Sequence, residues 1–216
     1  MKKSKAETAL TRKRIIEVAV QAFKANGIQA TGVAEIMQAA GLTHGAFYRH
    51  FESKEQLVCE ACAASMDVLL ESAENLGDTD ASYRKQIDYI LSAENRDDCV
   101  GGCPLAAMGS ELVRADAETR KVVSERYLEV IEAMASRGPN AGTKAGYADA
   151  VFALCSMIGA ITMSRIIDDP VASAQILDVA RKRLVPARSG PAAKKTVAAA
   201  RRVAPPRRKT AATVPA

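Results

Sequence analysis

Residues 42–51, LTHGAFYRHF, gather the chain's only two histidines with a threonine hydroxyl, an arginine and a tyrosine. The three aromatic rings of this segment are notable because the whole chain is 4% aromatic and has no tryptophan. Imidazole, hydroxyl and guanidinium groups at this density suit either acid–base catalysis or contacts to nucleic acid. Catalysis needs a base beside a nucleophile, and no serine-hydrolase, zinc-protease or phosphate-loop motif accompanies the segment. The segment therefore favours nucleic-acid contact, and we expect no catalytic residue, metal ligand or cofactor.

The cysteine thiols are the second set of residues that could be chemically reactive. Five cysteines without framework spacing are typical of reduced thiols and not of disulfides. Cys59 and Cys62 have CxxC spacing, but they lie among alanines without two further ligands, so we interpret them as buried small residues. Cys103 stands directly before a helix start in DDCVGGCPLAAMGSEL, where backbone N–H groups and the helix dipole should lower its pKa. Cys103 is then either a sensor of oxidants or electrophiles, or a packing residue.

Helices must position these groups. Alanine, leucine and glutamate abound while alternating β-type patterns are scarce, which predicts an all-α fold. Ile15, Ala19 and Phe23 form one apolar stripe of a first helix over residues 11–26, with Ile16 and Val20 alongside. Later apolar stripes predict five further helices. One starts at Tyr83 and ends near the sequence RDDCVGGCP, and the others cover residues 105–114, 123–134, 151–161 and 174–184.

Short capped helices surround the histidine-rich segment. Thr31 can cap a second helix, and Gly41 breaks it with the conformational freedom that a tight turn requires. Thr43 can cap a short third helix that ends near residue 50. Ser53 and Gln56 fit a capping box that opens a fourth helix. Two short helices joined by a glycine turn after an amphipathic helix form a helix-turn-helix pattern.

Charge divides the chain into three parts. Residues 1–54 carry nine Lys/Arg against four Asp/Glu, residues 55–184 carry thirteen against twenty-one, and residues 185–216 carry eight against none. The basic ends suggest a polyanionic partner, although solvated surface charge is the alternative. The last part is rich in Ala, Pro, Lys and Arg, so we expect it to be disordered. The N-terminus lacks a secretory signal and the apolar stretch over 151–163 is short for a bilayer, which predicts a cytoplasmic protein without membrane contact.

The run TRKRIIEVAVQAFKANGIQATGVAEIMQAAGLTHGAFYRHFESKEQLV resembles the N-terminal DNA-binding region of the tetracycline-repressor (TetR) family of bacterial regulators. The match is continuous over about a quarter of the chain. The Gly-Cys-Pro-Leu sequence at residues 102–105 is similar to one branch of that family. The resemblance implies nine helices in a two-domain homodimer: a helix-turn-helix domain with a basic N-terminal arm at residues 1–58, an effector-binding and dimerisation domain at 59–184, and the basic tail at 185–216.

The resemblance also implies which residues meet double-stranded operator DNA. Thr31 and Lys54 would contact phosphates from the starts of two helices. His44 and Arg49 occupy variable positions and would read bases, and an arginine on guanine contributes about 1–3 kcal/mol of discrimination. The other DNA-facing residues of the recognition helix would be Thr43, Gly45, Tyr48 and His50. His50 is about as suited to a structural hydrogen bond as to a phosphate contact.

The effector pocket is less well specified, because such pockets vary and are mostly apolar. The resemblance places Cys103 beside the pocket. Further candidate lining residues are Tyr89, Met108, Glu111, Arg114, Tyr127, Tyr147 and Met157.

The expected function is a sequence-specific transcriptional repressor that a small-molecule effector releases from a palindromic operator. The eighth and ninth helices would form the dimer interface, where Gly159 and Ala160 allow close approach; an ordinary intramolecular core is the alternative. A nucleoid-type architectural DNA-binding protein is the competing function, motivated by the basic tail. A thiol-dependent enzyme using Cys103 is a third, for which the sequence offers no nearby base.

Overall fold

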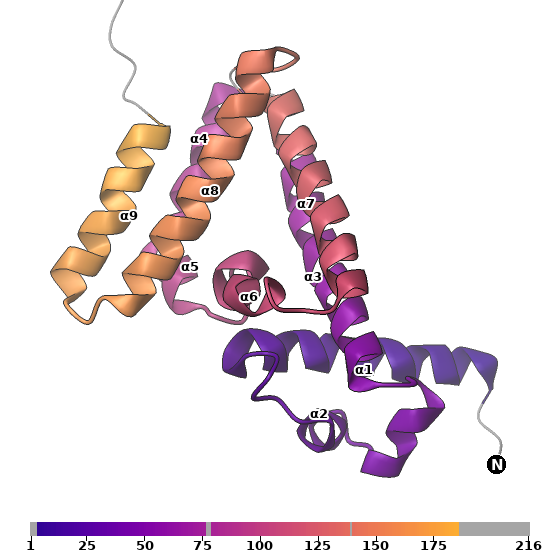
Figure 1. The fold of residues 1–216 in the computed structure, drawn as a ribbon. Helices are drawn as coiled ribbons and strands as arrows, with labels where there is room; N and C mark the ends of the chain where they lie inside the picture. Colours follow the sequence, from indigo (N-terminus) through magenta and orange to yellow (C-terminus); the bar gives the residue numbers. More distant parts are fainter. Residues whose placement is uncertain (1–3, 77–78, 139, 186–216) are drawn as a thin grey trace, which may run out of the picture. The chain divides into compact units, whose positions relative to one another are not determined.

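The computed structural model describes residues 4–76, 79–138 and 140–185. Their regular secondary structure consists of helices joined by turns and loops, with no strand among them (Figure 1). The all-α prediction is therefore confirmed for these ranges. The α-helices are α1 (Lys5–Asn26), α2 (Val33–Ala39), α3 (Lys54–Glu74), α4 (Asp80–Ile90), α5 (Ala93–Asp97), α6 (Pro104–Leu112), α7 (Ala117–Arg137), α8 (Lys144–Ile166) and α9 (Pro170–Leu184), and the 3-10 helix η1 (His44–Arg49) lies between α2 and α3. The basic tail predicted to be disordered falls outside the described residues.

Helix α1 begins earlier than the apolar stripe predicts. Ser4 and Glu7 form a capping box, in which the Glu7 backbone N–H donates to Ser4 Oγ at 3.1 Å and the Ser4 N–H donates to the Glu7 carboxylate at 2.7 Å. This reciprocal pair satisfies two donors that a helix start leaves open. Lys5 of the predicted basic arm consequently belongs to the first turn of α1.

Two glycines with positive φ shape the helix-turn-helix. Gly27 ends α1 at φ 88°, and Gly41 follows α2 at φ 72°, a backbone region that L-residues with side chains rarely adopt. The recognition helix then forms as η1, a 3-10 helix of six residues, and not as an α-helix. Its N-cap is Thr43, as predicted, although the Thr43 side chain makes no capping bond.

Only one of the two hydrogen bonds of the predicted capping box of α3 forms between the predicted residues. Ser53 Oγ accepts the Gln56 N–H at 3.2 Å, as the sequence predicts. The Gln56 side chain instead accepts the N–H of Glu52 at 2.7 Å, because it reaches back past Ser53. Helix α3 then runs unbroken across the predicted domain boundary at residues 58/59.

The helix predicted from Tyr83 onward is split in two. Leu91 ends α4, and Ser92 starts α5 by accepting the Asn95 N–H on its hydroxyl at 3.1 Å. The Asn95 side chain donates back to the Ile90 carbonyl at 2.7 Å, which fixes the corner. The serine and asparagine therefore bend a segment that its apolar spacing alone would continue.

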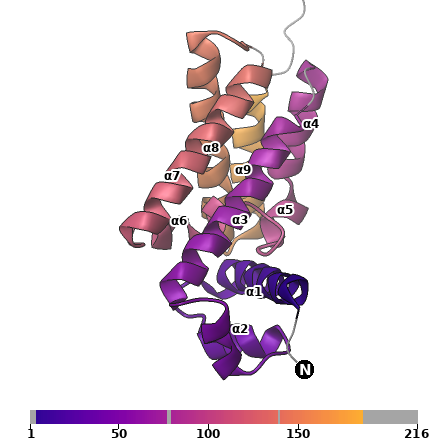
Figure 2. The same ribbon diagram turned by 90° about the vertical axis from the view of Figure 1, so that its right-hand side faces the viewer.

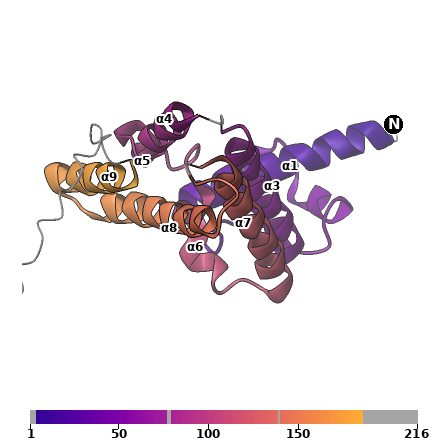
Figure 3. The same cartoon turned by 90° about the horizontal axis from the view of Figure 1, so that it is seen from above.

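The apolar side chains form two clusters. The first packs α1, α2, η1 and the first half of α3, and it also includes Met108 and Leu112 of α6. The second packs α4, α7, α8 and α9 against the end of α3. Helices α3 and α7 lie side by side (Figure 2) and α8 lies beside α9 (Figure 3), while α6 lies between these pairs and α1 (Figure 1). Helix α6 is thus the one short element that packs into both parts.

Helix α8 is longer than the apolar stretch predicted from sequence. Its 23 residues are long and apolar enough to cross a membrane by length and composition, so shortness does not argue against a span. The core helix of a soluble protein passes the same test, and Leu154, Met157 and Ile161 of α8 are buried in the second cluster. Core packing thus accounts for part of the apolar composition of α8, since 39% of its most apolar window is buried.

Candidate DNA-binding surface and effector cavity

The recognition helix η1 sits on an aromatic base. Phe47 and Phe51 are each 1% exposed and stack with ring centroids 5.4 Å apart. The Arg12 guanidinium lies 4.5 Å from the centroid of the Phe51 ring, forms an ion pair with Glu60, and donates through Nε to the His50 carbonyl at 3.2 Å. Arg12 therefore joins α1, η1 and α3, so it is neither the solvated residue nor the DNA-contacting arm that the sequence offered as alternatives.

The opposite face of η1 points to solvent. Thr43, His44, Gly45, Tyr48 and Arg49 are all exposed. The rings of His44 and Tyr48 meet edge to face at 6.1 Å, and Tyr48 is 67% exposed, an unusual state for a large ring. A Cβ added to Gly45 would meet no protein atom within 4 Å. The absence of a side chain at Gly45 therefore leaves room for an external molecule and not for the protein's own packing.

Three predicted DNA contacts take other positions. Thr31 is fully buried, and its hydroxyl donates to the Gly27 carbonyl at 2.7 Å, while Gly32 serves as the N-cap of α2. A phosphate contact through the Thr31 hydroxyl is therefore wrong for this arrangement. Lys54 is partly buried, and its amine donates to the Ile28 carbonyl at 2.9 Å, which braces α3 against the turn after α1. His50 is partly buried at the C-cap of η1.

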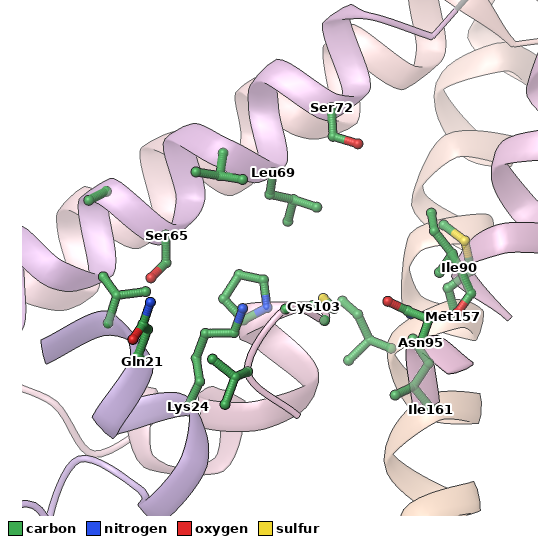
Figure 4. Close-up of a pocket in the computed structure, with 18 of the residues that line it drawn as sticks. Gln21, Lys24, Ser65, Leu69, Ser72, Ile90, Asn95, Cys103, Met157 and Ile161 are labelled. Carbon is green, nitrogen blue, oxygen red and sulfur yellow. Dashed lines mark hydrogen bonds between the residues drawn. The ribbon is translucent and has the colours of Figure 1, made fainter. Parts of the chain in front are cut away.

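A cavity of about 480 Å³ lies between α1, α3, α4, the loop before α6, and α8 (Figure 4). This volume falls within the range of small-molecule sites. Of the predicted pocket residues, Tyr89, Cys103 and Met157 line the cavity. Most of its wall is apolar and comes from α3, α4 and α8, through residues that include Leu69, Ile90, Leu154, Met157, Ile158 and Ile161.

Two predicted pocket residues instead hold α6 in place. Met108 is 1% exposed and packs in the first apolar cluster. The Glu111 carboxylate accepts the N–H groups of Ile28 and Gln29 at 3.0 and 2.8 Å. Both side chains lie against the helix-turn-helix and outside the cavity wall. Glu111 therefore ties α6 to the turn that follows α1.

The remaining predicted pocket residues lie away from the cavity. The Tyr127 hydroxyl lies 3.6 Å from Cys155 Sγ, and burial, followed by that thiol, raises the pKa of Tyr127 to about 12. Tyr147 is 44% exposed in the first turn of α8. Arg114 lines a small polar cleft beside Lys54. Of the aromatic and charged residues chosen from sequence, Tyr89 alone lies in the cavity wall.

The environment of Cys103 differs from the sequence prediction. Cys103 is the N-cap of α6, and the N–H groups of Leu105 and Ala106 favour its thiolate as expected. Burial outweighs them, however, and the pKa of the Cys103 thiol is raised above its usual value. The predicted low-pKa thiolate is therefore wrong, because a helix N-terminus activates a thiol only where solvent or counter-charge offsets its desolvation.

Sequence reasoning missed the contribution of α1 to the cavity. Ile16, Val20 and Lys24 line it, and their spacing of four residues continues one stripe along α1. Ile16 and Val20 already mark this second stripe in the sequence, and extending it by one turn would have found Lys24. Within the described ranges, no group of three or more His, Cys, Asp or Glu side chains is arranged to hold a metal ion.

The outer faces of α8 and α9 carry an apolar groove of about 650 Å³. Phe152 and Val179 in this groove are 61% and 52% exposed, and Gly159 lies between the two helices. Large apolar side chains exposed together mark interaction surfaces.

Comparison with known proteins agrees with this arrangement. Residues 15–61 match the family model described as bacterial regulatory proteins, tetR family. The HTH-type transcriptional regulator TtgR of Pseudomonas putida is 38% identical over 125 residues, which cover 56% of this chain and 51% of TtgR. AcrR of Shigella flexneri is 35% identical over 83 residues, which cover 38% of this chain and 35% of AcrR. The chain thus spans about half or less of the curated relatives it matches.

Solved structures extend the likeness beyond the helix-turn-helix. A TetR transcriptional regulator from Chloroflexus aurantiacus has a TM-score of 0.63 at 26% identity, over 83% of this chain and 94% of that one. The reduced form of Escherichia coli NemR has a TM-score of 0.67 at 18% identity, over 81% of this chain and 94% of NemR, which shows the fold alone. The tetR family model therefore covers the helix-turn-helix region of the chain, and the solved structures show that the remaining helices share the fold of such regulators.

Proposed function

We propose that this protein is a cytoplasmic, homodimeric transcriptional repressor that binds operator DNA through η1 and leaves it when a small molecule fills the central cavity. The exposed polar face of η1, mounted on the buried Phe47–Phe51 stack, carries this proposal. This buried aromatic stack holds the exposed side chains in a fixed geometry. Base-specific contacts to DNA require such a geometry. The regulators named among its relatives support the same function.

Base reading falls to His44 and Arg49, which are exposed at the two ends of η1. Gly45 and Tyr48 between them allow close approach and contact the DNA backbone. Lys54 contributes positive charge from the start of α3 while one of its N–H groups stays on Ile28. The division between base and backbone contacts is the usual one at protein–DNA interfaces.

The groove on α8 and α9 is the dimer surface in this proposal. A second copy related by two-fold symmetry would cover Phe152 and Val179 of both chains. A two-fold dimer places its recognition helices in successive major grooves, about 34–36 Å apart, which requires a palindromic operator.

Two helices connect the cavity to the helix-turn-helix and could transmit the effect of ligand binding. Helix α1 belongs to the helix-turn-helix and also lines the cavity, and α6 runs from the cavity at Cys103 to the helix-turn-helix at Glu111. A ligand that displaces α1 or α6 must therefore shift the recognition helix relative to α8 and α9. A change in the separation of the two recognition helices would release the operator.

Footprinting on DNA fragments selected from random sequence tests the function. The expected result is a protected palindrome with two half-sites one helical turn apart. Protection without a preferred sequence would instead support an architectural DNA-binding protein. Deleting residues 185–216 should flatten the dependence of log K on log[salt], by about 0.9 for each phosphate that these residues neutralise, while the protected sequence stays the same.

A further inference from the structure

We propose that the effector is an amphipathic anion, whose carboxylate-type group binds between the Lys24 ammonium and the start of α6 and whose apolar body lies between α3 and α8. This inference rests on the proposed function only in calling the ligand an effector. The binding site itself is argued from the cavity.

Lys24 is the cation of the cavity wall. It is partly buried on α1, and Figure 4 shows its side chain extending into the cavity toward Cys103. Within the described ranges its amine has no ion pair and no hydrogen bond. Burial consequently lowers the pKa of Lys24. A half-buried cation without an ion pair loses part of its hydration, and an anionic ligand would offset that loss.

Other positive groups surround the same end of the cavity. Helix α6 begins there, so its first N–H groups carry the positive end of the helix dipole. The Arg165 guanidinium donates to the carbonyls of Arg96, Asn95 and Asp98 at 2.7, 3.3 and 3.3 Å, and has no carboxylate partner among the described residues. The exposed Asp97 carboxylate, whose pKa is lowered by Arg96 and further by Arg165, offsets part of this charge.

Asp98 and Glu17 also oppose this positive charge. Asp98 is exposed, and it accepts the Gly101 N–H at 2.6 Å. Glu17 lines the cavity, but its side chain is 60% exposed and lies 3.8 Å from the Lys13 amine. Burial still dominates the pKa of Lys24, ahead of the attraction of Asp98. Lys24, Arg165 and the start of α6 therefore bring positive charge to this end of the cavity, where neither carboxylate forms an ion pair with the Lys24 amine among the described residues.

In the rest of the cavity, the side-chain N–H and O–H donors of the better-buried polar residues are bonded within the protein. The Asn95 amide donates to the Ile90 carbonyl at 2.7 Å, and the Ser65 hydroxyl donates to the Ala61 carbonyl at 2.9 Å. The Gln86 amide donates to the Ser72 hydroxyl at 3.1 Å. Since these groups are already paired within the protein, the ligand needs one charged end and an apolar remainder.

Calorimetric titration with three ten-carbon probes, each below its micelle-forming concentration, tests this inference. The probes are decanoate, 1-decanol and decylamine, which share an apolar chain and differ in charge. Wild type should bind decanoate about tenfold more tightly than 1-decanol, and decylamine most weakly, since tenfold corresponds to about 1.4 kcal/mol. Lys24→Met should abolish the preference for decanoate, and Lys24→Arg should keep it.

Lys5→Met is the matched control, because Lys5 lies on the same helix, is exposed, does not line the cavity and forms no ion pair with a described cavity residue. It should bind all three probes as wild type does. Equal affinity of wild type for decanoate and 1-decanol, a retained preference in Lys24→Met, or no binding of any probe would overturn the inference. Operator binding without probe is measured on the same samples. Absence of DNA binding with an intact decanoate preference would reject the proposed function and leave the anion site standing.

Discussion

The proposed recognition helix η1 and the central cavity differ in how they present polar groups. Helix η1 exposes polar groups from neighbouring residues above a buried aromatic stack. The cavity wall is built from side chains of α1, α3, α4 and α8. The N–H and O–H donors of its better-buried polar residues are bonded within the protein, whereas Lys24 has no ion pair among the described residues. A surface that reads a long polymer needs many exposed donors held rigidly. A cavity that detects one small molecule needs mainly shape and a single charge.

The largest expected effect separates the base of η1 from its face. Phe47→Ala should lower the free energy of unfolding by about 3–5 kcal/mol, because it removes a fully buried ring. Tyr48→Ala, on the adjacent exposed ring, should change it by less than about 0.5 kcal/mol and still weaken operator binding. Urea unfolding and fluorescence anisotropy measure the two quantities. Equal destabilisation by both variants would remove the distinction between base and face.

Within the face, Arg49 and Lys54 should behave differently. Arg49→Ala should weaken binding to the preferred site by about 1–3 kcal/mol and binding to random DNA little, because alanine cannot reach the base that arginine reads. Lys54→Ala should weaken both similarly. Competition binding against the two DNAs gives both values. If Arg49→Ala weakened binding to the preferred site and to random DNA equally, Arg49 would not make a base-specific contact.

Sequence was a good guide to the first region because its information is local. The glycine turn at Gly41, the Thr43 N-cap position and the inward Phe47 and Phe51 all follow from spacing within a few residues. Thr31 was misplaced because a hydroxyl suited to capping also fits a carbonyl one turn earlier. Short-range patterns thus fix the faces of helices better than they fix individual hydrogen bonds.

Sequence was a poorer guide to the cavity because its wall is assembled from segments far apart in the chain. Cys103 and Met157 line it, but Met108, Glu111 and Tyr127 do not. Their residue types suit a pocket, whereas the packing of α6 between α1 and α8 decides where each points. Lys24 escapes prediction because the sequence places α1 wholly in the DNA-binding domain.

The link between the two regions is the carboxylate of Glu111. Glu111→Gln weakens the charge-assisted bonds to the Ile28 and Gln29 N–H groups, so those amides should exchange with solvent about tenfold faster. Hydrogen–deuterium exchange of the peptide covering these residues measures this. Glu118→Gln removes an exposed carboxylate on α7 and serves as the control. Unchanged protection in Glu111→Gln would mean that α6 does not hold this turn.

The smallest expected effect concerns the thiol at the cavity. The pKa of Cys103 is raised by burial, so little thiolate is present near neutral pH and its alkylation should accelerate only as pH rises toward that pKa. Iodoacetamide should therefore modify the exposed Cys99 before Cys103 at neutral pH, and both equally in urea. Peptide mass spectrometry follows both sites. Faster modification of Cys103 in the native protein would restore the electrophile-sensor hypothesis, and release of DNA by an electrophile in wild type but not in Cys103→Ser would establish it.

Gly45 allows the most direct test of the claim that the exposed face of η1 meets DNA. A Cβ at this position meets no protein atom within 4 Å, so Gly45→Leu should leave the unfolding midpoint close to that of wild type. The same side chain would occupy the space that the DNA must enter. Anisotropy titration with the operator selected by wild type should therefore show affinity reduced to the level of random DNA. Wild-type operator affinity in a correctly folded Gly45→Leu variant would contradict the proposed recognition surface.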